Sequence, residues 1–460
     1  MTRTGPQGRT QPPQTDPIRA LLASPPDLPV VEVLPELRER LSSNPSASDD
    51  AGTCLVLTAP PGTGKTTLTP PLLADVLTNV PAGAPQRAPE RGPGRVVVTQ
   101  PRRIAARAAA RRLADLLGEE VGTTVGYAVR GERRAGPATR IEVVTAGLLL
   151  RRLQRDPELA GIDAVILDEV HERSLDSDLL LALLADARAA LREDLTLVAM
   201  SATLDADRLR RILGGTSGGA SPLVEVPGRL HPLEEVWAPP GRTGRLGPRG
   251  VPREFLAHVA ATVERALTER SGDVLVFLPG AREVDDVVAH LRDAAREGVD
   301  VLPLHGRLPA SAQDTALTPS PAGRRRVVVS TNVAESSLTV PGVRVVVDST
   351  LAREPRLDVA RSMSGLVTVG VSRAAGVRTL EAREAHQART RHQLLRTLLR
   401  AGRAGRARGA RRRLPLLLAH GLGARPAGPD PRDPVRGPHR CGPGAGRVGR
   451  ARRRGAGLGR

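Results

Sequence analysis

Small and hydroxyl residues follow the apolar segment Cys54–Thr58, and their pattern is that of a loop that binds phosphate. The run APPGTGKTT, residues 59–67, matches the phosphate-loop pattern with Ala59 in place of the first glycine. Small residues let backbone N–H groups close around phosphate, and a following helix adds its N-terminal dipole. We expect Lys65 to reach the β- and γ-phosphates of a nucleotide and Thr66 to hold Mg²⁺. The predicted phosphate-binding set is Gly62, Thr63, Gly64, Lys65, Thr66 and Thr67.

The alternative for this run is a glycine-rich turn that precedes an ordinary helix. The chain has 68 basic residues, and Lys65 is the only lysine among them. Because every other basic position is arginine, a single lysine at this place in the pattern favours phosphate binding.

Two adjacent acids, Asp168 and Glu169, follow another apolar run about a hundred residues later. Carboxylates at the end of a buried parallel strand are costly unless they face a cation or a polar cleft. We expect Asp168 to bind Mg²⁺ through water and Glu169 to orient an attacking water as general base. His171 is a further catalytic candidate and could also ligate a metal, although no other histidine is near it in the sequence. Taken alone, residues 168–171 are equally typical of a surface turn.

Strand-length apolar runs alternate with helix-length segments, which predicts the α/β class and a parallel sheet covered on both faces. The first unit has predicted strands Cys54–Thr58, Arg95–Thr99, Ile141–Thr145, Ala164–Asp168 and Leu195–Ser201, with helices Arg102–Leu117 and Asp176–Leu191. A Gly/Pro-rich passage then interrupts the pattern. It resumes with predicted helices Glu254–Thr268 and Arg282–Glu297 and strands Asp273–Leu278, Val301–Leu304, Arg326–Ser330 and Val343–Asp348.

Length and composition limit the class of protein. A chain of 460 residues is too long for one ordinary core and predicts two or three domains. Hydrophobic residues make up 40%, which excludes wholesale disorder. The sequence shows neither an apolar run of about 18 residues nor an N-terminal signal region. We therefore expect no membrane partner. Two cysteines cannot form a disulfide framework, which predicts a cytoplasmic protein.

The net charge of +19 suggests a partner rich in phosphate, but it is unevenly placed. Residues 1–370 contain 45 basic and 45 acidic residues, whereas residues 371–460 contain 23 arginines and four acids. The basic excess therefore lies in a C-terminal tail dominated by arginine, glycine and alanine. Such low-complexity composition predicts no packed domain.

Five segments in order resemble superfamily-2 helicases of the DEAH/RHA group. They are APPGTGKTT from Ala59, TQPRRIAARAAARRLA from Thr99, DEVHERSLDSDLL from Asp168, MSATLD from Met200 and TNVAESSLTVPGVRVVVDS from Thr331. The resemblance covers roughly residues 28–369. It implies two tandem RecA-like lobes, with ATP and Mg²⁺ in the cleft between them and single-stranded RNA or DNA across both. RNA is favoured over DNA by the resemblance alone, and no protein partner follows from the sequence.

The resemblance also implies roles for residues outside the phosphate loop and the acidic pair. Ser201 and Thr203 are expected to couple hydrolysis to strand movement. Ala146 stands where the family usually has glutamate, a departure that could weaken nucleic-acid contact. The expected nucleic-acid contacts are Arg102, Arg103, Thr145, Thr331 and Asn332. For the two arginines, the alternative is the solvated start of a helix.

The family's last catalytic element, Gln-Arg-x-Gly-Arg-x-Gly-Arg, supplies arginines that complete the ATP site from the second lobe. Here RAGRAGR, residues 400–406, follows Leu399 instead of glutamine and comes about twenty residues late. One alternative is an insertion before a working motif, in which Arg403 and Arg406 are the arginine fingers. The other, which the sequence favours, is a disruption near residue 370 that leaves RAGRAGR as an accident of composition.

These observations predict five regions: a disordered lead (1–17), lobe 1 (18–238), a linker (239–252), lobe 2 (253–370) and the basic tail (371–460). The predicted function is an ATP-dependent helicase that couples Mg-ATP hydrolysis to translocation on, or unwinding of, nucleic acid. The alternative is a catalytically impaired remnant of such a helicase that still binds ATP and nucleic acid.

Overall fold

The computed structural model describes fourteen stretches of the chain. They are residues 16–42, 53–60, 62–78, 94–202, 206–214, 220–228, 233–241, 244–248, 250–294, 297–320, 324–331, 340–358, 363–370 and 394–398. Within these stretches the chain forms two parallel sheets with helices against them, and a separate two-stranded sheet. The α/β class with two tandem parallel-sheet lobes is thereby confirmed.

Lobe 1 is built on a sheet of eight strands in the order β4-β3-β5-β2-β6-β7-β1-β8. The hairpin of β3 and β4 is antiparallel, and every other neighbouring pair is parallel. The strands are β1 (Cys54–Thr58), β2 (Val96–Gln100), β3 (Val125–Val129), β4 (Glu132–Arg134), β5 (Ile141–Thr145), β6 (Ala164–Leu167), β7 (Thr196–Ser201) and β8 (Leu223–Glu225).

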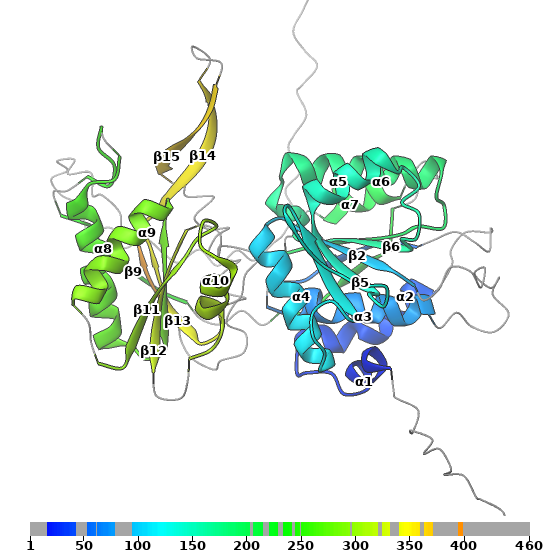
Figure 1. Ribbon diagram of the computed structural model, residues 1–460, viewed down its shortest axis with the longest axis horizontal. Coiled ribbons are helices and arrows are strands. Elements are labelled where there is room, and N and C mark those ends of the chain that lie inside the picture. Colours follow the sequence, from blue (N-terminus) through cyan, green and yellow to red (C-terminus); the bar gives the residue numbers. More distant parts are fainter. Residues whose placement is uncertain are drawn as a thin grey trace, which may run out of the picture. The chain divides into compact units, whose positions relative to one another are not determined.

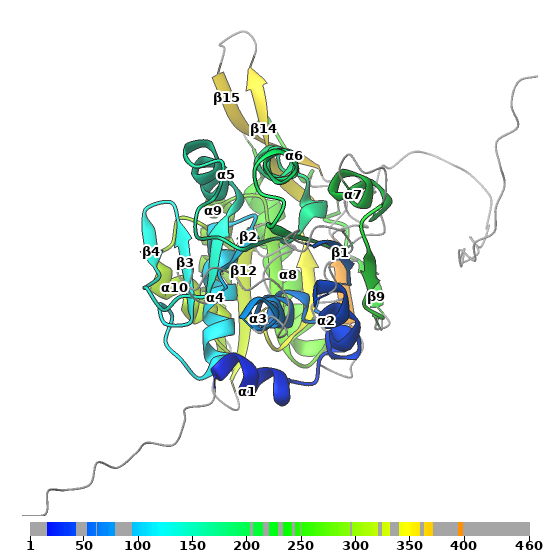
Figure 2. The same ribbon diagram turned by 90° about the vertical axis from the view of Figure 1, so that its right-hand side faces the viewer.

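Helices cover both faces of this sheet, as Figure 1 shows. One face is covered by α1 (Pro17–Ala23), α2 (Leu34–Ser42), α3 (Lys65–Thr78) and α4 (Arg103–Leu117). The other is covered by α5 (Ala146–Arg155), α6 (Leu175–Ala190) and α7 (Ala206–Leu213). The helices α1 and α2 pack beside α3 (Figure 2). Short 3₁₀ turns lie at η1 (Pro29–Val33) and η3 (Val170–Glu172).

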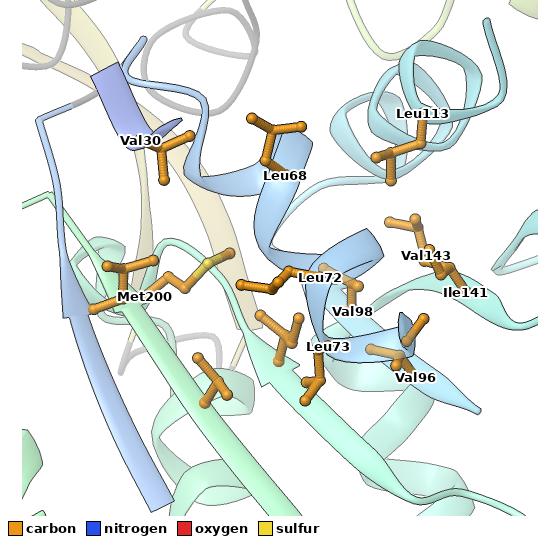
Figure 3. Packing of buried hydrophobic residues seen from close by; sticks show 14 of the residues in the cluster. Val30, Leu68, Leu72, Leu73, Val96, Val98, Leu113, Ile141, Val143 and Met200 are labelled. Carbon is orange, nitrogen blue, oxygen red and sulfur yellow. The ribbon is translucent and has the colours of Figure 1, made fainter. Parts of the chain in front are cut away.

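The central strands β1, β2, β6 and β7 are mostly apolar because both faces of the sheet are buried there. Along β2, Val96 and Val98 pack on the α3 side, whereas Val97 packs on the α5 side. Side chains alternate between the faces of a strand, so each central strand contributes apolar residues to both faces. Figure 3 shows Leu68 and Leu72 of α3 among the side chains of this first core. The packing fixes α3, and with it the loop that precedes it.

Lobe 2 is built on six parallel strands in the order β11-β12-β10-β13-β16-β9. One core face consists of α8, α9 and alternate residues of the central strands, and α10 packs on the other side. The elements are β9 (Leu233–Trp237), α8 (Arg253–Glu269), β10 (Asp273–Leu278), α9 (Ala281–Asp293), β11 (Val299–Leu304), α10 (Ala310–Leu317), β12 (Arg325–Thr331), β13 (Val343–Asp348) and β16 (Leu394–Leu398).

An antiparallel hairpin of β14 (Leu351–Asp358) and β15 (Met363–Gly370) projects from the body of lobe 2 (Figure 1). Near its base, Arg353 Nη2 lies 3.3 Å from Glu283 Oε1 at the start of α9. The Glu283 side chain is 10% exposed and that of Arg353 is 32% exposed, so this ion pair joins the hairpin to the lobe at a partly solvated position.

The sequence located most central strands to within one or two residues, and the differences are informative. The strand predicted at Ala164–Asp168 ends at Leu167, which leaves Asp168 in the loop. The hairpins β3–β4 and β14–β15 were not predicted. The strand β8 belongs to the first sheet and the next strand, β9, belongs to the second. The chain therefore passes from one sheet to the other before the linker expected at 239–252.

One described element lies in the region predicted as the basic tail. The strand β16 lies inside residues 371–460, where no packed element was expected, and pairs with β13 and β9. The rest of the tail and the lead before Asp16 lie outside the described residues. The exact domain boundaries stay predictions.

Candidate active site

The candidate site lies at the carboxyl ends of neighbouring strands in lobe 1. The strands β2, β6, β7 and β1 are adjacent in the sheet, and all run in the same direction. Ala59 follows β1, Asp168 follows β6, and Ser201 ends β7. Parallel pairing therefore gathers three segments that are far apart in the sequence at one edge of the sheet, which is where ligands bind in open α/β sheets.

The phosphate loop has the backbone conformation that its glycines permit. Gly62 and Gly64 have φ values of +79° and +93°, in a region that residues with a Cβ rarely adopt. Thr63 Oγ1 donates to the Pro60 carbonyl at 2.7 Å, and Thr67 N–H donates to the Gly64 carbonyl at 2.9 Å. The loop thus turns sharply from β1 into the first turn of α3, so that helix N–H groups face the sheet edge.

Two contacts join the start of α3 to the acidic pair. Lys65 Nζ lies 3.0 Å from Glu169 Oε1, and both side chains are less than a tenth exposed. Thr66 Oγ1 donates to Asp168 Oδ2 at 2.6 Å. The structure therefore brings together the four residues that the sequence selected from segments about a hundred positions apart.

Burial has opposite effects on the acids and on the lysine. It raises the pKa of Asp168 to about 6, an effect to which the neighbouring charge of Glu169 adds. The pKa of Glu169 is also raised, chiefly by burial. Burial by itself lowers the pKa of Lys65, but the charges of Glu169 and Asp168 outweigh it, and the net pKa is raised. Lys65 therefore stays protonated at neutral pH.

Glu169 has a left-handed backbone with φ of +54°, which is uncommon for a residue with a side chain. The conformation reverses the chain directly after β6, so that Glu169 faces Lys65 while Val170 enters the apolar core. Unusual backbone of this kind costs of the order of 1–3 kcal/mol and is typical of functional sites.

His171 joins the acidic pair to the end of β7. Its Nδ1 accepts the Ala202 N–H at 3.2 Å, so the ring proton is on Nε2, which lies 3.3 Å from Glu169 Oε2. Burial lowers the pKa of His171 to about 4, so the ring is neutral at pH 7. The ring therefore lies between Glu169 and Ala202, next to Ser201, and is hydrogen-bonded to Ala202, whereas Glu169 Oε2 has no hydrogen-bond partner in the part of the chain that the structure describes. Among the described residues no cluster of three or more metal-ligating side chains includes it.

The expected nucleic-acid residues of lobe 1 lie at the same sheet edge. Thr145 ends β5, the neighbour of β2, and Arg102 and Arg103 follow β2 at the start of α4. Arg103 is exposed, and Arg102 Nη2 lies 3.7 Å from Glu172 Oε2. Ala146, the first residue of α5, is buried in the core and presents no polar group at this edge.

Other predicted residues are not brought to this site by the described structure. Thr331 ends β12 in lobe 2, at the carboxyl edge of the second sheet. Thr203, Asn332, Arg403 and Arg406 lie outside the described residues. The sequence did not predict the contact of Gln100 with the acidic pair, in which Gln100 Nε2 donates to Asp168 Oδ2 at 2.7 Å. Its signal was a polar side chain at the end of an otherwise apolar strand.

The side chains fit a nucleotide with a divalent cation. The Thr66 hydroxyl and the Asp168 carboxylate offer hard oxygen donors, which Mg²⁺ prefers, beside a protonated lysine for phosphate. Glycines at positive φ let the loop backbone approach a phosphate closely. None of the described helices combines the length and the apolar character needed to cross a membrane.

Comparison with family models gives two matches. The DEAD/DEAH box helicase model matches residues 44–212, and the helicase conserved C-terminal domain model matches residues 257–408. The first match contains the phosphate loop and the acidic pair. The second extends 38 residues beyond position 370 and includes Arg403 and Arg406.

Individual relatives agree with these matches. The ATP-dependent RNA helicase HrpB of Escherichia coli (strain K12) is 42% identical over 351 residues, which cover 76% of this chain and 39% of the relative. The probable ATP-dependent RNA helicase DHX34 of Mus musculus is 36% identical over 288 residues, covering 61% of this chain and 24% of the relative. The chain therefore spans about two fifths of HrpB and a quarter of DHX34.

A solved structure shares the fold. The crystal structure of Escherichia coli DEAH/RHA helicase HrpB matches with a TM-score of 0.66 at 39% identity, over 82% of this chain and 43% of that chain. The family matches and this likeness agree with the arrangement of the loop, the acidic pair and the two sheets. The chain belongs to the DEAH/RHA helicases.

Proposed function

We propose that this chain is the ATP-hydrolysing motor of an RNA helicase, which couples hydrolysis of the β–γ bond of ATP to movement on single-stranded RNA. The observation that carries the proposal is the paired contact of Lys65 with Glu169 and of Thr66 with Asp168. The names of its relatives as RNA helicases support RNA over DNA. A cytoplasmic location stays a prediction.

In this proposal, ATP replaces the contact that Lys65 makes with Glu169. Phosphate oxygens of ATP take the place of Glu169 beside Lys65, and this exchange frees the Glu169 carboxylate. With its pKa raised by burial, Glu169 is well suited to accept a proton from the attacking water. Thr66 and Asp168 hold Mg²⁺, which when bound neutralises phosphate charge.

Movement along RNA needs a connection from this site to the bound strand. In the proposal, Arg102, Arg103 and Thr145 contact the strand from lobe 1, and Thr331 and Asn332 contact it from lobe 2. The ring of His171 connects Glu169 to Ala202, which lies between the coupling candidates Ser201 and Thr203. This connection supports a role for the segment in sensing the state of the ATP site.

Arg403 and Arg406 are proposed as the arginine fingers. The family match through residue 408 supports the insertion alternative over a disruption near residue 370, since it includes the displaced motif. A guanidinium suits this role because its fixed fork stabilises the charge of the transferring phosphoryl group.

The test is the rate of ATP hydrolysis with and without single-stranded RNA. We expect Lys65→Ala and Glu169→Gln to reduce the rate at least a hundredfold, and Arg403→Ala and Arg406→Ala to reduce it by about a thousandfold. The matched controls are Glu193→Gln, an exposed acid between α6 and β7, and Arg411→Ala, beyond the family match. Both should hydrolyse ATP at the wild-type rate.

The outcomes separate the alternatives. Equal rates for the wild type, Lys65→Ala and Glu169→Gln would overturn the enzymatic assignment. ATP binding without turnover in the wild type would favour the impaired remnant. Wild-type rates in both finger variants, with loss in Lys65→Ala, would show that RAGRAGR is an accident of tail composition.

A further inference from the structure

A buried glutamine, Gln100, lies between the candidate nucleic-acid residues and the acidic pair. It is the last residue of β2 and is 2% exposed. On one side Gln100 pairs with Thr145 of β5. On the other side of β2, Thr99 pairs with Leu167 of β6. The next residues of the two chains, Gln100 and Asp168, are therefore neighbours. Strand pairing alone therefore places this side chain between a predicted nucleic-acid contact and the metal-binding carboxylate.

Gln100 contributes directly to the orientation of that carboxylate. Its Nε2 donates to Asp168 Oδ2 at 2.7 Å, and Thr66 Oγ1 donates to the same oxygen at 2.6 Å. Oδ2 therefore accepts from two side chains, while the Glu169 N–H donates to Oδ1 at 2.9 Å. Of these three donors, Gln100 is the one that belongs to the strand leading to Arg102.

The segment after Gln100 makes a second contact with the acidic loop. Pro101 restricts the backbone between Gln100 and Arg102, so these two residues are joined by a short, stiff link. Arg102 Nη2 lies 3.7 Å from Glu172 Oε2, in the turn that follows Glu169. A phosphate of bound RNA would compete with Glu172 for Arg102, and the stiff link would transmit a shift of Arg102 to Gln100.

We propose that Gln100 is a positioning residue that couples nucleic-acid binding at Arg102 and Arg103 to the orientation of Asp168. The inference rests on the proposed ATPase function and adds to it the route by which RNA alters the ATP site. A glutamine that only satisfied a buried carboxylate would affect stability, whereas a coupling residue also changes how ATP and RNA affect each other's affinity.

Two substitutions remove the hydrogen bond in different ways. Gln100→Met keeps the length of the side chain and removes the donor. Gln100→Asn keeps the amide but shortens the side chain by one methylene, so the amide no longer reaches Asp168. It serves as the test variant if Gln100→Met does not fold. The matched control is Gln154→Met on α5, where the side chain is exposed.

The full chain is used in two binding measurements. The first is the affinity for a fluorescent single-stranded RNA, with and without a non-hydrolysable ATP analogue and Mg²⁺. The second is the Mg²⁺ concentration that gives half-maximal binding of a fluorescent ATP analogue. Thermal melting verifies that each variant is folded, and ATP hydrolysis by the wild type and Lys65→Ala is measured in parallel.

We expect the Gln100 variants to bind RNA without nucleotide within about twofold of the wild type, because this side chain is buried. The effect of the ATP analogue on RNA affinity should shrink at least about fivefold, and the Mg²⁺ requirement should rise about tenfold. Gln154→Met should match the wild type in both measurements.

Wild-type coupling and wild-type Mg²⁺ requirement in a folded Gln100 variant would overturn the inference. Loss of hydrolysis in Lys65→Ala would leave the proposed function standing in that case. If Lys65→Ala instead hydrolyses ATP as fast as the wild type, the proposed function itself fails.

Discussion

At the scale of residues, the acidic pair shows how function is placed at a cost to stability. Asp168 and Glu169 are 5% and 7% exposed, adjacent in sequence and both ionisable. Burial disfavours their charged forms, and a single nearby cation, Lys65, compensates only in part. In the proposed function, where the site receives phosphate and Mg²⁺, carboxylates that are poorly solvated before the ligand arrives are an advantage.

Replacement of Asp168 by asparagine tests this cost. The folded-state pKa of about 6 lies above the ordinary aspartate value of 3.8, so the folded protein binds the proton more tightly, and stability falls as the pH rises from about 4 to 6. Asp168→Asn should therefore raise the free energy of unfolding by about 1–3 kcal/mol at pH 7.5 in EDTA, and by almost nothing at pH 4. Urea denaturation at the two pH values measures the difference.

The control for this prediction is Asp186→Asn, an exposed position on α6. It should change stability little at either pH, and it should keep ATP hydrolysis, which Asp168→Asn should lose. A gain of equal size at pH 4 and pH 7.5 would contradict the assignment of the effect to the buried charge.

At the scale of elements, the phosphate loop depends on packing from a distant segment. A Cβ built on Gly64 would lie 2.7 Å from Leu28 Cδ1, and the Thr63 carbonyl accepts the Val30 N–H at 3.0 Å. The segment before α2 therefore presses on the loop and holds its shape. The motif needs glycine at Gly64 both for its φ of +93° and for this close approach.

Two alanine substitutions separate the cost of the positive φ from the cost of the close approach to Leu28. Gly118 ends α4 with φ of +69° and has open space around its Cβ direction, so Gly118→Ala should cost only the backbone conformation, about 1 kcal/mol. Gly64→Ala should cost about 2–3 kcal/mol, because Leu28 must also move. Urea denaturation of the two variants measures the costs, and binding of a fluorescent ATP analogue should weaken at least tenfold in Gly64→Ala alone. Equal costs would show that the Leu28 contact is unimportant.

At the scale of the whole molecule, charge and chemistry are in different regions. Residues 1–370 carry no net charge, whereas residues 409–460, beyond the family match, contain 13 arginines and two aspartates. The charge of these last residues attracts any polyanion, independently of the ATP site. Coupled binding and non-specific attraction should therefore be separable.

Deletion of residues 409–460 should weaken RNA binding at low salt and flatten its salt dependence. Each lost arginine–phosphate contact lowers the slope of log affinity against log salt by about 0.7 for a single strand. The RNA-stimulated rate of ATP hydrolysis at saturating RNA should stay at the wild-type level, because the family match ends at residue 408. A filter-binding titration at several salt concentrations measures the slope.

Deletion of residues 1–15, which contain only Arg3 and Arg9 as basic residues, is the control and should leave the slope almost unchanged. If removal of residues 409–460 changed neither the affinity nor the slope, the tail would not be a site of RNA attraction.

The local pattern was enough to predict the central elements and the chemistry at their ends. Mostly apolar runs of six residues predicted strands such as β10 and β13 with their exact bounds, because their central residues are buried on both faces of the sheet. Short edge strands such as β4 were missed, since Glu132–Arg134 is charged and owes its conformation to pairing with β3.

The sequence by itself predicted the family and the two sheets, which are confirmed, and it selected Lys65, Thr66, Asp168 and Glu169 as the candidate site, since each lies in a local motif with a physical requirement. The tertiary structure alone decided which side chains meet. Gln100 reaches Asp168, and His171 accepts from Ala202, because parallel pairing makes neighbours of β2, β6 and β7. Strand order is a property of non-local packing, and no spacing along the chain encodes it directly.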